Sequence, residues 1–85
     1  METANIEQDI RRFLVDQFLH GRPEGLPEDG SLLGNVIDST GVLELIGFLQ
    51  DHFAIVVEDD EVVPGNLDSV TIVVAYVAGK LQAKS

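Results

Sequence analysis

Ser39 is the residue of this 85-residue chain that is best placed to carry chemistry. It follows Asp38 at the point where a Gly- and Pro-rich segment gives way to a helical pattern. The first turn of a helix presents unpaired backbone N–H groups and the positive end of the helix dipole to an anion, so a serine there suits a phosphate ester. Taken alone, an Asp-Ser pair more commonly acts only as a helix cap.

Neither histidine supplies Ser39 with a general base. His52 lies 13 positions further along the same predicted helix, which corresponds to about 20 Å. His20 falls at the end of another predicted helix, where a surface position is expected. Ser39 also lacks the preceding glycine of a G-x-S-x-G nucleophile elbow. We therefore predict no catalytic residue.

Metal and nucleotide sites find no support in the sequence. The acidic run 58–61 lacks the spacing of a calcium loop, and Pro64 interrupts the segment after it, so the run is interpreted as solvated charge. The glycines form neither a Walker motif nor a dinucleotide fingerprint. The chain has no cysteine, which excludes disulfides, zinc ribbons and thiol nucleophiles of its own. We predict no metal site.

The charge of the chain is strongly negative and unevenly distributed. Fifteen Asp and Glu residues face five Lys and Arg, for a formal net charge of −10, and no Lys or Arg occurs from Pro23 to Gly79. Such a surface repels nucleic-acid backbones and steers basic partners toward itself. A solvated face kept charged for solubility is the alternative. The hydrophobic share of 45% argues against disorder.

The N-terminal segment and the apolar runs predict a single cytoplasmic domain over residues 1–85. The first residues lack the apolar core of a secretory signal peptide. The longest apolar run, 70–79, is much shorter than the roughly 20 residues that span a bilayer.

The first predicted helix is amphipathic, and a long loop follows it. Its apolar stripe is formed by Ile6, Ile10, Phe13, Leu14 and Phe18. Asn5 and Gln8 resemble a capping box, and Gly21 supplies a stop. Residues 21–37 are then punctuated by Gly and Pro too often for a regular element. Apolar residues in this loop should pack against the core: Leu26, Leu32, Leu33, Val36 and Ile37.

The second predicted helix begins at Asp38-Ser39, with Asp38 as its N-cap. Its buried stripe is formed by Val42, Leu45, Ile46, Leu49 and Phe53. Leu43 and Gly47 lie off this stripe beside acidic residues, and an exposed leucine there hints at a contact surface.

The remaining segments leave alternatives open. Residues 55–57 fit a short strand or an apolar connection, and 58–64 could hold one helical turn that Pro64-Gly65 ends. Residues 70–77 are rich in β-branched side chains, which favours a strand. The same segment carries a helical stripe that Asp68 or Ser69 could cap, formed by Val70, Val73, Val74, Val77 and Leu81.

The segment 33–45, L-G-N-V-I-D-S-T-G-V-L-E-L, resembles the acyl carrier protein family. That family's signature is Asp-Ser followed by a helix with Glu-Leu a few residues on. Further family positions match at Leu49, Phe53, Ile55 and Val57. The acidic run and a last helix follow, so the resemblance extends from the first helix to Leu81.

The resemblance implies an all-α fold, a small four-helix bundle with three longer helices, a short third helix and a long loop between helices 1 and 2. It also implies that a transferase attaches 4′-phosphopantetheine from coenzyme A to Ser39, and that Asp38 contacts this transferase besides capping the helix. The thiol of the arm would then carry an acyl group as a thioester. On this interpretation the chain is no enzyme, and it imports the thiol that its composition lacks. The second pair, Asp68-Ser69, is expected to cap the fourth helix, so Ser39 and not Ser69 is the modified serine.

The sequence departs from the usual family pattern near the serine. Thr40 stands where a leucine is usual, Gly41 where a second acid often occurs, and Gly47 where a methionine is common. Two residues are also added between Gly34 and Asp38. These features are more similar to D-alanyl carrier proteins and dedicated stand-alone carriers. They favour a specialised lipid or secondary-metabolite pathway and a loading ligase. Whether the cargo is acyl or aminoacyl stays open.

Basic patches on the transferase, the loading ligase and downstream acyl-handling enzymes are expected to dock on one surface of a monomeric carrier. The residues assigned to this docking surface are Thr40, Leu43, Glu44, Gly47, Asp51, Val57, Asp59 and Asp60. An unmodified acidic helical adaptor that binds basic proteins is the alternative from another class. It explains the charge, but it gives no reason for Asp38-Ser39 at the junction of loop and helix.

Overall fold

The computed structural model describes residues 3–26, 30–34 and 36–84. In this part of the chain there are four α-helices and two 3₁₀ turns, and no extended strand. The helices are α1 (Thr3–Phe18), α2 (Ser39–Phe53), α3 (Pro64–Leu67) and α4 (Val70–Lys84), and the turns are η1 (Pro23–Gly25) and η2 (Asp59–Glu61). The predicted all-α bundle, with three longer helices and a short third one, is confirmed.

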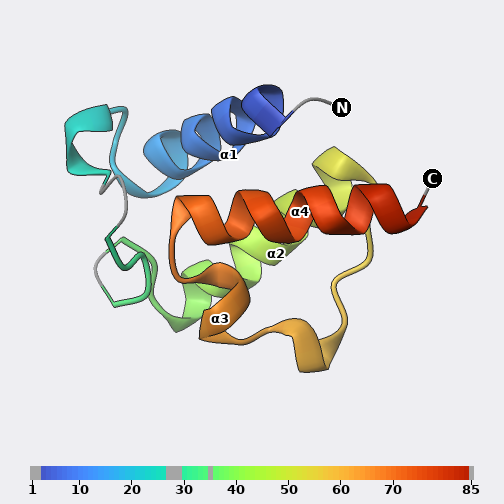
Figure 1. The fold of residues 1–85 in the computed structure, drawn as a ribbon. Helices are drawn as coiled ribbons and strands as arrows, with labels where there is room; N and C mark the ends of the chain where they lie inside the picture. The colour runs from blue at the N-terminus through green and yellow to red at the C-terminus, as the bar shows by residue number, and fades with distance from the viewer. Residues whose placement is uncertain (1–2, 27–29, 35, 85) are drawn as a thin grey trace.

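The helices pack around α4 (Figure 1). α4 contacts α1, α2 and α3, and it runs antiparallel beside α1. The first turn of α1 and the last turn of α4 lie at one end of the bundle, whereas α2 begins at the opposite end, where the long loop delivers the chain. The start of α2 is therefore separated from the first turn of α1 and from the last turn of α4.

One apolar core joins the three long helices. The predicted stripes point inward, because successive turns of each helix contribute buried side chains: Ile6, Ile10, Leu14, Leu45, Leu49, Phe53, Val70, Val73, Val74 and Val77. Five other residues of the predicted stripes are only partly buried and pack against this core: Phe13, Phe18, Val42, Ile46 and Leu81. The predicted packing of the loop is confirmed as well, since Leu26, Leu32 and Ile37 are buried.

α1 begins earlier than the sequence predicts. Its first residue is Thr3, so Asn5 lies inside the helix and the predicted capping box of Asn5 and Gln8 is wrong. Residues three apart are also neighbours on a helix face, which is why an interior polar pair imitates a cap. The stop at Gly21 is confirmed. Gly21 has a φ of +80° and donates its N–H to the Val15 carbonyl at 3.0 Å.

The last segment is a helix, which resolves the competition between strand and helix. Ser69 caps it, because its hydroxyl oxygen accepts the N–H of Ile72 at 3.1 Å. The side chain of Asp68 is engaged elsewhere, by Ser31 and by the backbone of Leu33. Burial of the valine stripe outweighs the weak preference of β-branched residues for strands.

The connection between α2 and α3 runs without a strand through residues 54–58 and then makes one turn. Ala54 takes a left-handed conformation with a φ of +56°, which ends α2. The predicted helical turn is present as η2. The expectation that Pro64-Gly65 only ends it is wrong, since Pro64 opens α3. Proline suits the first position of a helix because no intrahelical partner exists for an N–H there.

Candidate functional site

The structure places Ser39 on the surface, as the first residue of α2. Asp38 precedes it in extended conformation and is the N-cap. Its Oδ1 atom accepts the N–H of Gly41 at 2.7 Å, and its carbonyl accepts the N–H of Val42 at 3.0 Å. The predicted cap is therefore confirmed. It holds the first turn of α2 in register and leaves the Ser39 side chain exposed.

Gly41 allows this first turn to lie close to its neighbours. A Cβ atom at this position would lie 2.9 Å from Ile37 Cγ2 and 2.9 Å from Phe18 Cε1. Any side chain at this position would force the side chains of Ile37 and Phe18 to shift. The glycine found where the family often has an acid is thus explained by packing.

A shallow hollow of about 420 Å³ adjoins Ser39. Its walls come from the loop and from the first turn of α2, and they are mostly apolar: Leu33, Gly34, Ile37, Asp38, Ser39 and Val42. A group attached to Ser39 would therefore leave the helix beside an apolar surface.

Asp68 fixes the loop that forms this hollow. Its Oδ1 atom accepts the hydroxyl of Ser31 and, at 3.2 Å, the N–H of Leu33. Its carbonyl also accepts the N–H of Leu32 at 2.6 Å. The junction of α3 and α4 thus holds the loop in place through both the side chain and the backbone of one residue. No sequence pattern indicated this role.

The second Asp-Ser pair differs from the first in exposure. Ser69 is 9% exposed, and its hydroxyl serves the cap of α4. Ser39 is exposed, and the cap of its helix is supplied by Asp38. Modification of Ser69 would therefore break the bond that caps α4, whereas modification of Ser39 would leave the cap of α2 intact.

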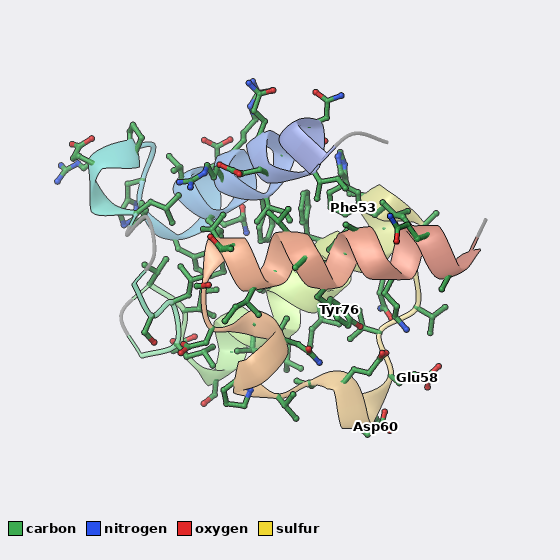
Figure 2. The ribbon with its side chains drawn as sticks, viewed as in Figure 1. Phe53, Glu58, Asp60 and Tyr76 are labelled. Carbon is green, nitrogen blue, oxygen red and sulfur yellow. The ribbon has the colours of Figure 1, made fainter. Side chains whose placement is uncertain are left out.

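Most residues assigned to docking do lie on the surface. Thr40, Glu44 and Asp51 are exposed on α2, where Leu43 is 69% exposed, and Asp59 and Asp60 are exposed on η2. Figure 2 shows Glu58 and Asp60 on the outer side of that turn. Gly47 is half-buried.

Val57 is the exception. It is 9% exposed, and its N–H donates to Gln50 Oε1 at 3.0 Å, which holds the residue against the core. The expectation that its side chain faces a partner is wrong. Its neighbour Val56 is 64% exposed and takes the outward position.

The acidic run is not solvated throughout, because Glu61 ties η2 to α4. Glu61 Oε1 lies 2.7 Å from Lys80 Nζ and accepts the Tyr76 hydroxyl at 3.1 Å and the Glu58 N–H at 2.9 Å. The hydrogen bond from Lys80, followed by that from Glu58, lowers the pKa of Glu61. Burial, followed by the bond to Glu61, raises the pKa of Tyr76 to about 12. Figure 2 shows Tyr76 on the side of α4 that faces this segment.

A stack of rings joins α1 to α2, which no sequence pattern indicated. The rings of Phe13 and Phe48 are stacked with centroids 4.1 Å apart, and His52 stacks on Phe48 at 4.9 Å. His52 Nε2 also lies 2.9 Å from Asp9 Oδ2. His52 is therefore engaged near the end of α2, far along the helix from Ser39.

Residues 3–26, 30–34 and 36–84 contain neither a candidate metal site nor a candidate membrane-spanning helix. No group of three or more His, Cys, Asp or Glu side chains is arranged to hold a metal ion. No helix there has the length and apolar character needed to cross a membrane.

Comparison with known proteins gives one informative similarity. No family model matches the chain. The chain is 29% identical over 73 residues to the probable acyl carrier protein PigG of Serratia sp. (strain ATCC 39006), and the alignment covers 85% of this chain and 84% of that protein. The similarity is thus spread along both chains and includes more than the surroundings of one motif. Together with the helical bundle, this similarity supports the acyl carrier protein family as the family of this chain.

Proposed function

We propose that this chain is an acyl carrier protein whose Ser39 bears 4′-phosphopantetheine. The observation that carries the proposal is an exposed serine at the first position of α2, directly after a residue that already caps the helix. The N–H groups and dipole at this helix end favour the negative charge of a phosphodiester. The similarity to a probable acyl carrier protein supports the same conclusion.

Attachment would be a transfer from coenzyme A catalysed by a separate transferase. A bond forms between Ser39 Oγ and the phosphorus atom that bears the pantetheine arm. The bond from that phosphorus to the bridging oxygen of the pyrophosphate breaks, and the nucleotide leaves as 3′,5′-bisphosphoadenosine. The hydroxyl proton goes to a base of the transferase. When bound, the arm supplies a thiol that carries an acyl group as a thioester.

The chain's own residues position the arm. Asp38 holds the first turn of α2, and the loop held by Asp68 presents Leu33 and Ile37 beside Ser39. The apolar hollow formed there gives the arm or its cargo a surface to rest on, while the open side leaves it accessible. We propose that the transferase also contacts Asp38 and recognises its carboxylate.

Partner enzymes with basic patches would dock on the acidic surface beside Ser39. We propose that Thr40, Leu43, Glu44, Gly47 and Asp51 on α2 take part, together with Asp59 and Asp60 on η2 and with Val56 in place of Val57. Exposed ion pairs contribute only about 0.2–1 kcal/mol each. Such weak contacts suit a cytoplasmic carrier that must leave one enzyme for the next: transferase, loading ligase, then acyl-handling enzymes of a specialised lipid or secondary-metabolite pathway.

The decisive experiment is intact-mass analysis after incubation with coenzyme A and a broad-specificity phosphopantetheinyl transferase. We expect the wild-type chain to gain one phosphopantetheine group and Ser39→Ala to gain none. Ser69→Ala is the matched control and should still be modified. Attachment to Ser39→Ala would overturn the assignment of the serine. Failure of the wild type with several transferases would favour the unmodified acidic adaptor.

A further inference from the structure

We propose that Asp68 is a positioning residue for the attachment of phosphopantetheine to Ser39, an inference that rests on the proposed function. Asp68 lies at the junction of α3 and α4, far from Ser39 in the sequence. It would act through residues 31–34, 36 and 37, the entry segment, which leads the chain into the cap of α2. Part of this segment lines the hollow beside Ser39, so its position decides which surface a transferase meets there.

Asp68 holds the start of the entry segment at adjacent residues. Its Oδ1 atom accepts the Ser31 hydroxyl and, at 3.2 Å, the N–H of Leu33. Its carbonyl accepts the N–H of Leu32 at 2.6 Å. The Leu32 side chain is fully buried, so this middle residue is also fixed by packing. The junction of α3 and α4 therefore determines where the entry segment begins.

Hydrogen bonds continue from Leu32 to Ile37. The carbonyl of Leu32 accepts the N–H groups of Val36 and Ile37, both at 2.9 Å. The N–H of Gly34 donates to the carbonyl of Ile37 at 2.8 Å, and Gly34 has a φ of +85°, which lets the chain turn back on itself. Ile37 is buried and directly precedes the cap of α2. A series of hydrogen bonds thus connects Asp68 to the residue before that cap.

A loosely held entry segment would weaken recognition of Ser39 without changing the chemistry at its hydroxyl. A transferase that reaches Ser39 meets the first turn of α2 on one side and the entry segment on the other. If that segment is in the binding arrangement for only part of the time, the apparent affinity falls by the same fraction. Once the complex has formed, the enzyme holds the segment and the hydroxyl reacts as before. The expected effect is a higher KM with a nearly unchanged kcat.

Two other effects of removing Asp68 can be separated by matched variants. The first effect is the loss of a negative charge, to which basic partners respond. Asp68→Asn removes the same charge as Asp68→Ala but retains an oxygen that can accept the bonds from Ser31 and Leu33. The second effect is a loss of stability. Ser69→Ala removes the hydroxyl that caps α4 at the next residue, and it leaves the bonds of Asp68 in place.

The test measures the kinetics of phosphopantetheine attachment to the full chain, with coenzyme A, a broad-specificity transferase and intact-mass detection. We expect Asp68→Ala to raise the KM for the carrier about three- to tenfold and to leave kcat within about twofold of the wild type. Asp68→Asn should restore most of the wild-type KM, and Ser69→Ala should keep it. Ser31→Ala removes one bond from the loop side without a change of charge, so it should raise KM by a smaller factor.

Amide signals of the ¹⁵N-labelled chain without its arm give a readout that needs no transferase. Asp68→Ala should shift the signals of Ile37 and Ser39, whereas Ser69→Ala should shift mainly those at the start of α4. Unchanged signals at Ile37 and Ser39 in Asp68→Ala would contradict the proposed connection between Asp68 and the modified serine.

The kinetic results can also overturn this inference. Wild-type KM values for both Asp68→Ala and Ser31→Ala would show that the entry segment does not limit recognition. An equal increase of KM in Asp68→Asn would assign the effect to charge, and an equal increase in Ser69→Ala would assign it to stability. If the wild-type chain itself gains no arm, the proposed function fails and this inference fails with it.

Discussion

Two glycines of α2 have opposite surroundings, although both lie in helical backbone. A Cβ at Gly41 would approach Ile37 and Phe18 to 2.9 Å, whereas a Cβ at Gly47 would meet no atom within 4 Å beyond its chain neighbours and the nearby backbone of its own helix. The first glycine permits a close contact between elements. The second leaves space open and carries the usual conformational cost of glycine in a helix.

Alanine at these two positions should therefore change stability in opposite directions. We expect Gly41→Ala to lower the free energy of unfolding by about 1–3 kcal/mol, because the extra methyl group overpacks the start of α2. Gly47→Ala should raise it by about 0.5–1 kcal/mol through helix propensity. Urea unfolding followed by circular dichroism measures both. Equal changes in the free energy of unfolding would show that the contacts around position 41 do not limit the size of the side chain there.

The two roles given to Asp38 can be separated by substitution. Asp38→Ala should cost about 1 kcal/mol of stability, because the Gly41 N–H loses its acceptor, whereas Asp38→Ser should retain most of it. If the transferase reads the carboxylate, both variants should be modified more slowly than the wild type. Thermal unfolding and the rate of phosphopantetheine attachment are the two measurements. If Asp38→Ser is modified at the wild-type rate, the only role of Asp38 is to cap α2.

Local spacing explains which single residues could be predicted from the sequence. The cap of Asp38 acts over three residues, so its pattern is visible in the chain itself. Ile55, Val56 and Val57 are three apolar residues in a row, and no local pattern says which of them points outward. Gln50 decides this by accepting the N–H of Val57, a bond seen only in the folded protein.

At the scale of elements, α4 is the segment for which local signals disagree most. Its valines favour a strand by propensity and a helix by spacing. The helix forms because that spacing places Val70, Val73 and Val77 against the core, and tertiary burial commonly dominates propensity. The position of the long loop was beyond prediction for another reason. Ser31 and Asp68 are 37 residues apart in the chain, and no periodic pattern connects them.

The bonds made by Asp68 should determine how firmly that loop is held. Asp68→Ala removes the acceptor for the Ser31 hydroxyl and the Leu33 N–H, and hydrogen bonds to a charged group contribute about 1.5–3 kcal/mol. We expect reduced stability and faster hydrogen exchange at the amide of Leu33. Asp68→Asn retains a side-chain oxygen that can accept these bonds, so it should lose less stability than Asp68→Ala.

Asp60 supplies the control for this loop experiment. It is acidic and exposed on η2, so Asp60→Ala removes one charge without touching the loop. Unchanged exchange at Leu33 in Asp68→Ala would show that the backbone bond between Leu32 and Asp68 is sufficient to hold the loop.

At the scale of the whole molecule, stability should fall in alkali between about pH 10 and pH 12. The pKa of Tyr76 is raised from 10.0 to about 12 by burial and by Glu61. In that interval the unfolded chain releases the phenol proton while the folded chain retains it, so rising pH favours unfolding. Tyr76→Phe has no phenol proton to release, so its free energy of unfolding should fall less steeply over this pH interval. Urea unfolding at several pH values compares the two chains, and parallel curves would contradict the assignment to Tyr76.

Acid should weaken the molecule through the same network, because the pKa of Glu61 is lowered by Lys80. The stabilising contribution is present above the ordinary glutamate pKa and is lost as the pH falls through the lowered value. Lys80→Gln should reduce this acid sensitivity. The network could not be derived from the sequence, since the run 58–61 resembles solvated charge until Tyr76 and Lys80 are seen beside it.

The layout of the bundle has a practical consequence for how this protein can be handled. The first turn of α1 and the last turn of α4 share one end, and α2 starts at the other. A tag at either terminus would therefore anchor the molecule to a resin or a sensor surface with Ser39 directed away from the support. Immobilisation through one end should leave enzymes free access to the serine, and the choice between an N-terminal and a C-terminal tether should make little difference.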